Sequence, residues 1–131
     1  MASVLVVDDH MEIRLIFSRS LRDAGYEVYG AKNGEEALSM LETTRPDIIL
    51  LDVFMPVMNG AEFLEHMRKS SLHGSTPVLL LSAVPDSPEV VYATKLGISK
   101  FLRKGDFNLT QLQEIIKETL SASESSTTPT Q

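Results

Sequence analysis

Cysteine and tryptophan are absent from this chain of 131 residues, and only 6% of its residues are aromatic. Without cysteine the chain can form neither disulfides nor thiolate metal sites, which fits a reducing compartment. The apolar run at the N-terminus has no basic start and stops at acidic residues, unlike a signal peptide. No apolar run approaches the length of a membrane span. We therefore expect a cytoplasmic protein without a membrane partner.

Positive charge is also scarce, because 12 Lys and Arg residues stand against 18 Asp and Glu residues, for a net charge of -6. Binding to nucleic acid needs a basic surface that neutralises phosphate groups. The composition therefore argues against direct binding of nucleic acid by this domain. The length suits one domain that buries about two-thirds of its unfolded surface.

Five short apolar segments alternate with five segments of helical periodicity. The expected strands are Ser3–Val7, Tyr26–Tyr29, Ile48–Leu51, Pro77–Ser82 and Ile98–Leu102. Because each spacing from strand to helix is short, the pattern predicts βαβ units in an α/β fold, a doubly wound five-stranded parallel sheet covered on both faces. The domain is expected to span residues 1–121. Residues 122–131 are mostly Ser and Thr, which predicts a disordered tail or linker.

Three asparagines mark expected turns or helix starts. Asn33, with Glu36 three residues later, predicts an N-cap and a capping box. Asn108 lies in a glycosylation-like triplet, but without a secretory signal it is better interpreted as a helix cap. Asn59-Gly60 is typical of a tight turn.

The segment from Asp47 to Gly60, D-I-I-L-L-D-V-F-M-P-V-M-N-G, is the most informative part of the chain. Its apolar run is typical of a strand buried on both faces, and Asp52 ends that run. Open α/β sheets hold their ligands beyond the carboxyl ends of strands. We therefore expect Asp52 to be presented to solvent on a loop made rigid by the proline and the Asn-Gly pair.

Polar residues end three further strands, namely Asp8 and Asp9, Ser82, and Lys104. The carboxyl ends of parallel strands converge, so three carboxylates would repel one another by roughly 1 kcal/mol per pair at 4 Å in water and about 4 kcal/mol at an effective dielectric of 20. Lys104 and a hard divalent cation would offset this repulsion. Since only His10 supplies a nitrogen donor nearby, the set favours Mg²⁺ over zinc.

A carboxylate beside Mg²⁺, a lysine and a hydroxyl is suited to accept a phosphoryl group. The attacking oxygen of Asp52 is already anionic and needs no general base. The surrounding groups would then position the phosphoryl group and neutralise its oxygens.

These motifs resemble those of the receiver domain of two-component response regulators, in particular those like the chemotaxis regulator. The matching segments are V-L-V-V-D-D, P-D-I-I-L-L-D-x-x-M-P-x-M-N-G, P-V-L-L-L-S-A and G-x-x-x-F-L-x-K, which together cover Ser3 to about Leu120. The resemblance implies a flavodoxin-like fold with strand order 2-1-3-4-5. It also implies a phosphorylation-activated switch, not an enzyme, that assists its own Mg²⁺-dependent phosphorylation and dephosphorylation.

The resemblance assigns a role to each residue of the metal site. Asp52 is the implied phospho-acceptor, and Asp9 and Asp52 would bind Mg²⁺ directly together with the main-chain carbonyl of Phe54. Asp8 would hold the ion through water.

The resemblance also implies how a signal leaves the site. Ser82 and Lys104 would grip the phosphoryl oxygens, and Phe101 would turn inward when Ser82 moves. A histidine kinase or phosphotransfer protein would be the donor. A downstream protein or a missing output domain would be the target, docking on the fourth helix, fifth strand and fifth helix, and a phosphorylation-dependent homodimer is compatible with this arrangement.

One residue departs from the family pattern, because Gly105 stands where receivers usually have a proline after a cis peptide. A cis bond before a residue other than proline costs about 2.5 to 4 kcal/mol, so we predict a trans Lys104–Gly105 peptide.

Other interpretations remain open. Each acid alone could be a helix N-cap, and a pseudo-receiver would use the same fold without phosphorylation. A flavodoxin-like cofactor binder is disfavoured, since Asp8 and Asp9 would repel a phosphate. A phosphatase with an Asp nucleophile would usually carry a second Asp where this chain has Phe54.

Overall fold

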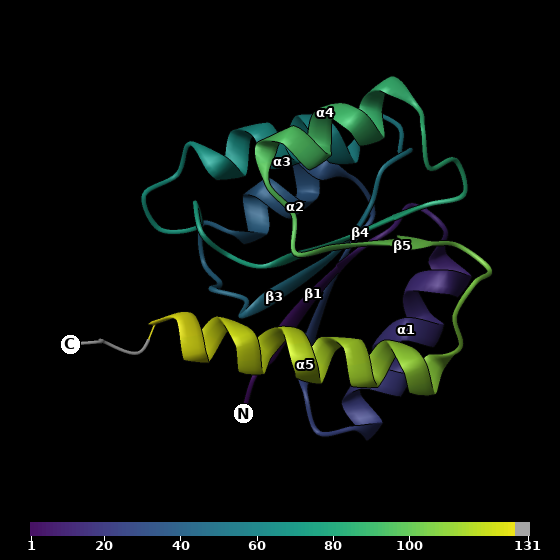
Figure 1. The fold of residues 1–131 in the computed structure, drawn as a ribbon, viewed down its shortest axis with the longest axis vertical. Helices are drawn as coiled ribbons and strands as arrows, with labels where there is room; N and C mark the ends of the chain where they lie inside the picture. The colour runs from purple at the N-terminus through teal and green to yellow at the C-terminus, as the bar shows by residue number, and fades with distance from the viewer. Residues whose placement is uncertain (128–131) are drawn as a thin grey trace.

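A five-stranded parallel sheet forms the centre of the computed structural model, which describes residues 1–127 (Figure 1). The strands lie in the order β2-β1-β3-β4-β5. In chain order the elements are β1 (Ser3–Val7), α1 (Met11–Asp23), β2 (Glu27–Ala31), α2 (Gly34–Met40), β3 (Ile48–Asp52), α3 (Gly60–Arg68), β4 (Val78–Ser82), α4 (Pro88–Leu96), β5 (Lys100–Arg103) and α5 (Leu109–Thr127). The predicted alternation and strand order are both confirmed.

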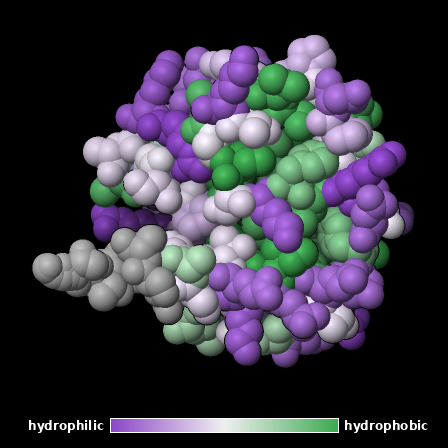
Figure 2. Space-filling view, viewed as in Figure 1, coloured by the Kyte–Doolittle hydropathy of each residue, from purple (hydrophilic) through white to green (hydrophobic). Residues whose placement is uncertain are grey.

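Helices cover both faces of the sheet, with α1 and α5 on one face and α2, α3 and α4 on the other (Figure 1). Side chains of a strand point alternately to opposite faces. Accordingly Leu5 and Val7 join the core under α2, α3 and α4, whereas Val4 and Val6 join the core under α1 and α5. All residues of β1, β3 and β4 are buried. Between α4 and α5, the outer surface shows apolar patches surrounded by hydrophilic side chains (Figure 2).

Two edge strands begin or end away from their predicted positions. β2 spans Glu27–Ala31 instead of Tyr26–Tyr29, because its pairing with β1 continues to Val7 opposite Ala31. β5 spans Lys100–Arg103 instead of Ile98–Leu102, with Arg103 paired to Ser82 at the end of β4. The register with the neighbouring strand, which a local pattern does not contain, fixes these ends.

The last helix extends beyond the predicted domain end at residue 121. α5 continues to Thr127, while the rest of the predicted tail lies outside the described residues, and a disordered tail or linker stays a prediction. A helix whose first turns are packed can propagate cheaply even through poor helix formers. Within residues 1–127, no helix combines the length and apolar character needed to cross a membrane.

Two predicted helix caps are confirmed. The Asn108 side chain accepts a hydrogen bond from the Gln111 amide at 2.8 Å, while the Asn108 amide donates to the Gln111 side chain at 2.9 Å. The Asn33 side chain accepts from the Glu36 amide at 2.8 Å. The return bond of the predicted capping box is displaced by one residue, because the Glu36 side chain accepts from the Lys32 amide instead.

The tight turn predicted at Asn59-Gly60 is wrong. Asn59 is the N-cap of α3 in a full capping box with Glu62, and Gly60 is the first helical residue. Gly60 lies against the end of β3, where its amide donates to the Val53 carbonyl at 2.7 Å. A Cβ at Gly60 would overlap the main-chain oxygen of Asp52 and lie 2.9 Å from the Cα of Val53. Glycine is therefore needed here for close approach of α3 to the strand that carries Asp52.

Replacing Gly60 by alanine should lower the free energy of unfolding by about 1–3 kcal/mol, because the new methyl group overpacks the contact with β3. It should also shift the amide resonances of Asp52 and Val53. The matched control is Gly25→Ala, where an added Cβ has nothing within 4 Å but the φ of 99° is strained, which costs about 1–2 kcal/mol. Urea unfolding and amide spectra measure both effects. Unchanged Asp52 and Val53 resonances in Gly60→Ala would contradict this account.

Candidate functional site

The candidate site lies at the edge of the sheet where β1, β3, β4 and β5 end. These ends align because Val7 pairs with Leu51, Asp52 with Leu81, and Ser82 with Arg103. The polar residues predicted for the site are all present at this edge: Asp8, Asp9, Asp52, Ser82 and Lys104. The structure therefore brings together residues that are up to 96 positions apart.

Asp52 is buried, and the prediction that it is presented to solvent is wrong. The residue is 3% exposed, and Asp8 beside it is 2% exposed. Asp52 is still a paired residue of β3, and the amino group of Lys104 lies against its carboxylate. A site that a strand-end pattern places at the surface is thus closed by a residue from the far edge of the sheet.

Lys104 contacts two of the three acids. Its Nζ lies 3.0 Å from Oδ1 of Asp52 and 3.8 Å from Oδ2 of Asp8. The lysine side chain is itself only 26% exposed, so solvent screens these contacts less than on an open surface. The cation therefore offsets part of the repulsion among the carboxylates.

Burial nevertheless dominates the protonation of Asp52. The pKa of its carboxyl is raised from the usual 3.8 to about 6, chiefly by loss of water, and the charges of Asp8 and Asp9 act in the same direction. The hydrogen bond and the charge of Lys104 lower this pKa without cancelling the effect of burial. The positive charge of Lys104 is therefore not enough to offset the burial and the negative charges of the site.

Two oxygen atoms of the acids have no hydrogen-bond partner. Within the part of the chain that the structure describes, Oδ2 of Asp52 and Oδ1 of Asp9 are the buried side-chain atoms in this condition. A buried polar group without a partner costs about 1–3 kcal/mol, and more when charged. Ligand atoms from Asp8, Asp9, His10 and Asp52 lie within 4.8 Å of one another. Unpartnered carboxylate oxygens at this spacing fit a hard divalent cation such as Mg²⁺.

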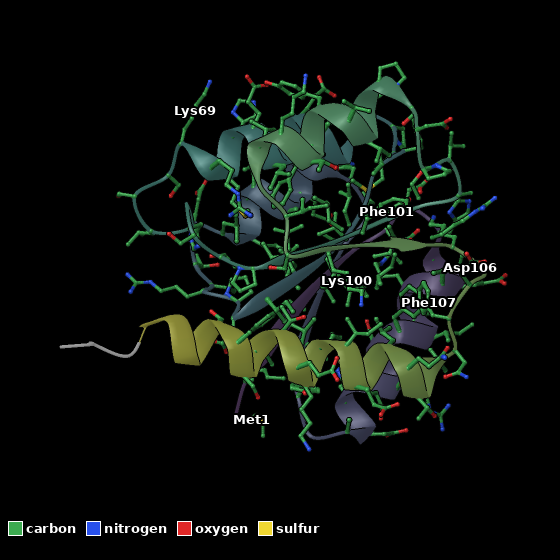
Figure 3. The ribbon with its side chains drawn as sticks, viewed as in Figure 1. Met1, Lys69, Lys100, Phe101, Asp106 and Phe107 are labelled. Carbon is green, nitrogen blue, oxygen red and sulfur yellow. The ribbon has the colours of Figure 1, made fainter. Side chains whose placement is uncertain are left out.

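The two predicted switch residues lie on adjacent strands. The Ser82 hydroxyl accepts from the Val84 amide at 3.0 Å and donates to the Val84 carbonyl at 3.2 Å, so it is held within its own loop. Phe101 is half-buried on β5, on the face flanked by α4 and α5 (Figure 3), and packs against the core under α4. Their movements, the carbonyl of Phe54 and the water-mediated role of Asp8 stay predictions.

The peptide between Lys104 and Gly105 is trans, as predicted, since the described residues contain no cis peptide bond. Gly105 has a φ of 91°, a value that residues with side chains rarely adopt. The glycine therefore sets the backbone direction directly after Lys104.

Two further residues contact the acidic pair, of which sequence reasoning noted His10 as a neighbour of the acids and missed Arg14. Nη1 of Arg14 donates to the main-chain carbonyl of Asp8 at 2.7 Å, and its aliphatic stem lies against Gly30. His10 donates its main-chain amide to Asp8 at 2.9 Å and turns its ring toward both acids. The adjacency of His10 to the acids was visible in the sequence, whereas no sequence signal indicated that Arg14 contacts the carbonyl of Asp8.

Comparison with known proteins agrees with this geometry. The family model described as the response regulator receiver domain matches residues 4–117. The chemotaxis protein CheY4 of Vibrio cholerae is 41% identical in sequence, with a TM-score of 0.82 that covers 91% of this chain and 98% of CheY4. A CheY-like response regulator receiver domain protein from Methanospirillum hungatei is 28% identical, with a TM-score of 0.89 over 96% of this chain and 98% of that protein.

Longer proteins match as well. The alkaline phosphatase synthesis transcriptional regulatory protein PhoP of Bacillus subtilis is 35% identical over 92% of this chain, which spans 49% of PhoP. The regulatory protein AtoC of Escherichia coli is 32% identical over 89% of this chain, which spans 25% of AtoC. The chain thus corresponds to half or less of these relatives.

The raised pKa of Asp52 makes stability depend on pH. The folded state holds the Asp52 proton more tightly than the unfolded state, so without divalent ions the free energy of unfolding should fall as pH rises from about 4 to about 6, by up to about 3 kcal/mol. Asp52→Asn should remove this loss and be the more stable protein at pH 7. Urea unfolding in chelator across this range tests it, with the exposed Asp106→Asn as control. Equal pH dependence in wild type and Asp52→Asn would contradict the assignment.

Proposed function

Because the chain belongs to the response regulator receiver domain family, we propose that it is a signalling switch controlled by phosphorylation of Asp52. One observation carries this proposal. The buried Asp52 carboxylate has one oxygen on Lys104, while its other oxygen has no partner, and the residue belongs to the cluster with Asp8, Asp9 and His10. Membership of the family implies interaction with a histidine kinase or a phosphotransfer protein.

The transfer itself would need little from the protein beyond positioning. An oxygen of Asp52 forms the new bond to phosphorus, and the bond from phosphorus to the donor breaks with its electron pair leaving on the donor. Lys104 already lies 3.0 Å from this carboxylate and would hold a phosphoryl oxygen after the transfer. Accordingly the chain would not act as an enzyme on other substrates, but would assist its own phosphorylation and dephosphorylation.

Mg²⁺ would be held by Asp9 and Asp52, by the main-chain carbonyl of Phe54, and by Asp8 through water. When bound, the ion would supply positive charge that neutralises the phosphoryl oxygens. The two unpartnered oxygens belong to Asp9 and Asp52, the residues assigned direct contact, which supports this ligand set.

The signal would leave through Ser82 and Phe101. The Ser82 hydroxyl would exchange its bonds to Val84 for a phosphoryl oxygen, and Phe101 would turn further into the core. Such a change shifts a population between two forms of the face made by α4, β5 and α5. That face carries the apolar patches seen in Figure 2, which suit a protein target.

The wider function is part of the same proposal. Because PhoP and AtoC are longer than this chain, the target is either a separate protein or an output domain joined to the chain. A phosphorylation-dependent homodimer through the same face and the expected cytoplasmic location belong to this proposal too. A pseudo-receiver is the alternative, and it is disfavoured because every residue needed for transfer is present at the site.

Adding beryllofluoride, a phosphate mimic, with Mg²⁺ should shift the amide resonances near Asp52, Ser82 and Phe101. Ser82→Ala should keep the shift at Asp52 but lose it at Phe101, because the relay then lacks its hydroxyl. Asp52→Asn should show neither shift. An unchanged wild-type spectrum would reject the switch in favour of the pseudo-receiver.

Phe54 offers a test of signal duration. Its side chain is 44% exposed in the loop that follows Asp52, where an apolar group hinders the water that would hydrolyse the acyl phosphate. Phe54→Asn should therefore speed dephosphorylation severalfold, measured as loss of phosphoprotein after the donor is removed. Val57→Asn also replaces an apolar side chain by asparagine in the same loop and should leave the rate of dephosphorylation unaltered. A rate that is equal or slower in Phe54→Asn would refute the idea.

A further inference from the structure

His10 occupies the N-cap position of α1, but its side chain makes no capping hydrogen bond. Instead Nδ1 of the ring lies 3.3 Å from Oδ1 of Asp9 and 3.4 Å from Oδ1 of Asp8. The side chain is 63% exposed, so this orientation is not imposed by burial in the core. The ring is thus a nitrogen donor beside the acidic cluster.

The spacing of these atoms matches that of ligands sharing one ion. An ion that binds its ligands at about 2.1 Å in an octahedron holds neighbouring ligand atoms about 3 Å apart and opposite ones about 4.2 Å apart. The ring nitrogen and the two carboxylate oxygens are near the shorter value. The whole set, with Asp52, falls within 4.8 Å. Small side-chain adjustments would therefore bring Asp9, Asp52 and His10 onto one ion, with Asp8 near enough to hold it through water.

A second observation points to a ligand here. Asp52 is only 3% exposed, and its Oδ2 has no hydrogen-bond partner. Oδ1 of Asp9 likewise makes no hydrogen bond, although the ring nitrogen of His10 lies 3.3 Å from it. Both residues belong to the set that includes the ring of His10. Together with the ring nitrogen of His10, these carboxylate oxygens make a set of both oxygen and nitrogen donors.

We propose that His10 is a direct ligand in the metal site of this chain and gives that site a preference for transition-metal ions such as Mn²⁺ and Co²⁺ over Mg²⁺. The inference rests on the proposed function, because it concerns the same site. Mg²⁺ is a hard ion that prefers oxygen ligands, whereas imidazole suits transition metals. The benefit of His10 should therefore grow from Mg²⁺ through Mn²⁺ to Co²⁺, in the order of their affinity for nitrogen.

A competing role for the ring predicts the opposite change in metal affinity when His10 is removed. If His10 served only as a hydrogen-bonding neighbour of Asp8 and Asp9, its ring would compete with any cation for the two carboxylates. Removing it would then strengthen binding of every divalent ion. Removing a ligand weakens binding instead, and most for the ions that prefer nitrogen.

Calorimetric titration of the wild-type chain and His10→Ala with MgCl₂, MnCl₂ and CoCl₂, at one mildly alkaline pH, separates these roles. His10→Ala should lower Co²⁺ affinity by about tenfold or more, Mn²⁺ affinity less, and Mg²⁺ affinity by less than about threefold. His66→Ala removes an exposed histidine of α3 and is the matched control. Pulsed electron paramagnetic resonance of bound Mn²⁺ should show nitrogen coupling in the wild type and the control, and none in His10→Ala.

Each other result overturns the inference in a recognisable way. Stronger binding of all three ions by His10→Ala would make the ring a competing neighbour of the two carboxylates and not a ligand. Unchanged Co²⁺ affinity without nitrogen coupling, while Mg²⁺ still binds, would remove His10 from the site and leave the proposed function standing. No binding of any divalent ion by the wild type would reject both the inference and the metal site of the proposed function.

Discussion

The Asp52 carboxylate is held almost out of contact with water beside two further acids, and the chemistry of the site depends on this constraint. Burial destabilises the charged form of this carboxyl, and the charges of Asp8 and Asp9 destabilise it further. Lys104 offsets part of this cost, yet two oxygens remain without partners. The protein thus keeps a destabilised anion at the edge of an otherwise well-paired sheet, where a cation or a phosphoryl group would relieve it.

The scaffold around this anion is rigid for identifiable reasons. β3 is covered on both faces, so the end of the strand cannot shift without disturbing both cores. Gly60 brings the start of α3 against Asp52 and Val53, and Arg14 ties α1 to the carbonyl of Asp8. The acids are therefore positioned by main-chain packing from three elements, in a geometry that tolerates their repulsion.

The residues that would carry a signal are held more loosely than those that would receive it. The Ser82 hydroxyl bonds to Val84 within its own loop, and Phe101 is half-buried on the edge strand β5. The contacts of the hydroxyl can be exchanged at small cost, because they involve no core packing. This contrast between a fixed acceptor and exchangeable neighbours is what a two-state switch requires. Phe101 lies on the same side of the molecule as the apolar patches between α4 and α5 (Figures 2 and 3).

Much of the fold and of the candidate site could be predicted from local sequence pattern. Apolar runs defined the buried strands, their alternation with helical periodicity predicted the parallel sheet, and the strand-end positions of Asp8, Asp52 and Lys104 predicted a common edge. The Asn108 cap and the trans peptide before Gly105 were predicted in the same way. These features depend on a few adjacent residues, or on the rule that parallel strands end on one side.

The tertiary structure alone decided how the edge is closed. Asp52 is buried with Lys104 from the far strand against its carboxylate, and Asn59 caps a helix because Gly60 fits against β3. The turn of His10 toward the acids likewise follows from where β1 ends and α1 begins. Burial and close approach depend on segments distant in the chain, so the local sequence pattern does not predict them. By itself the sequence determined the scaffold and the chemical groups of the site, whereas packing between distant segments determined their protonation, partners and access to water.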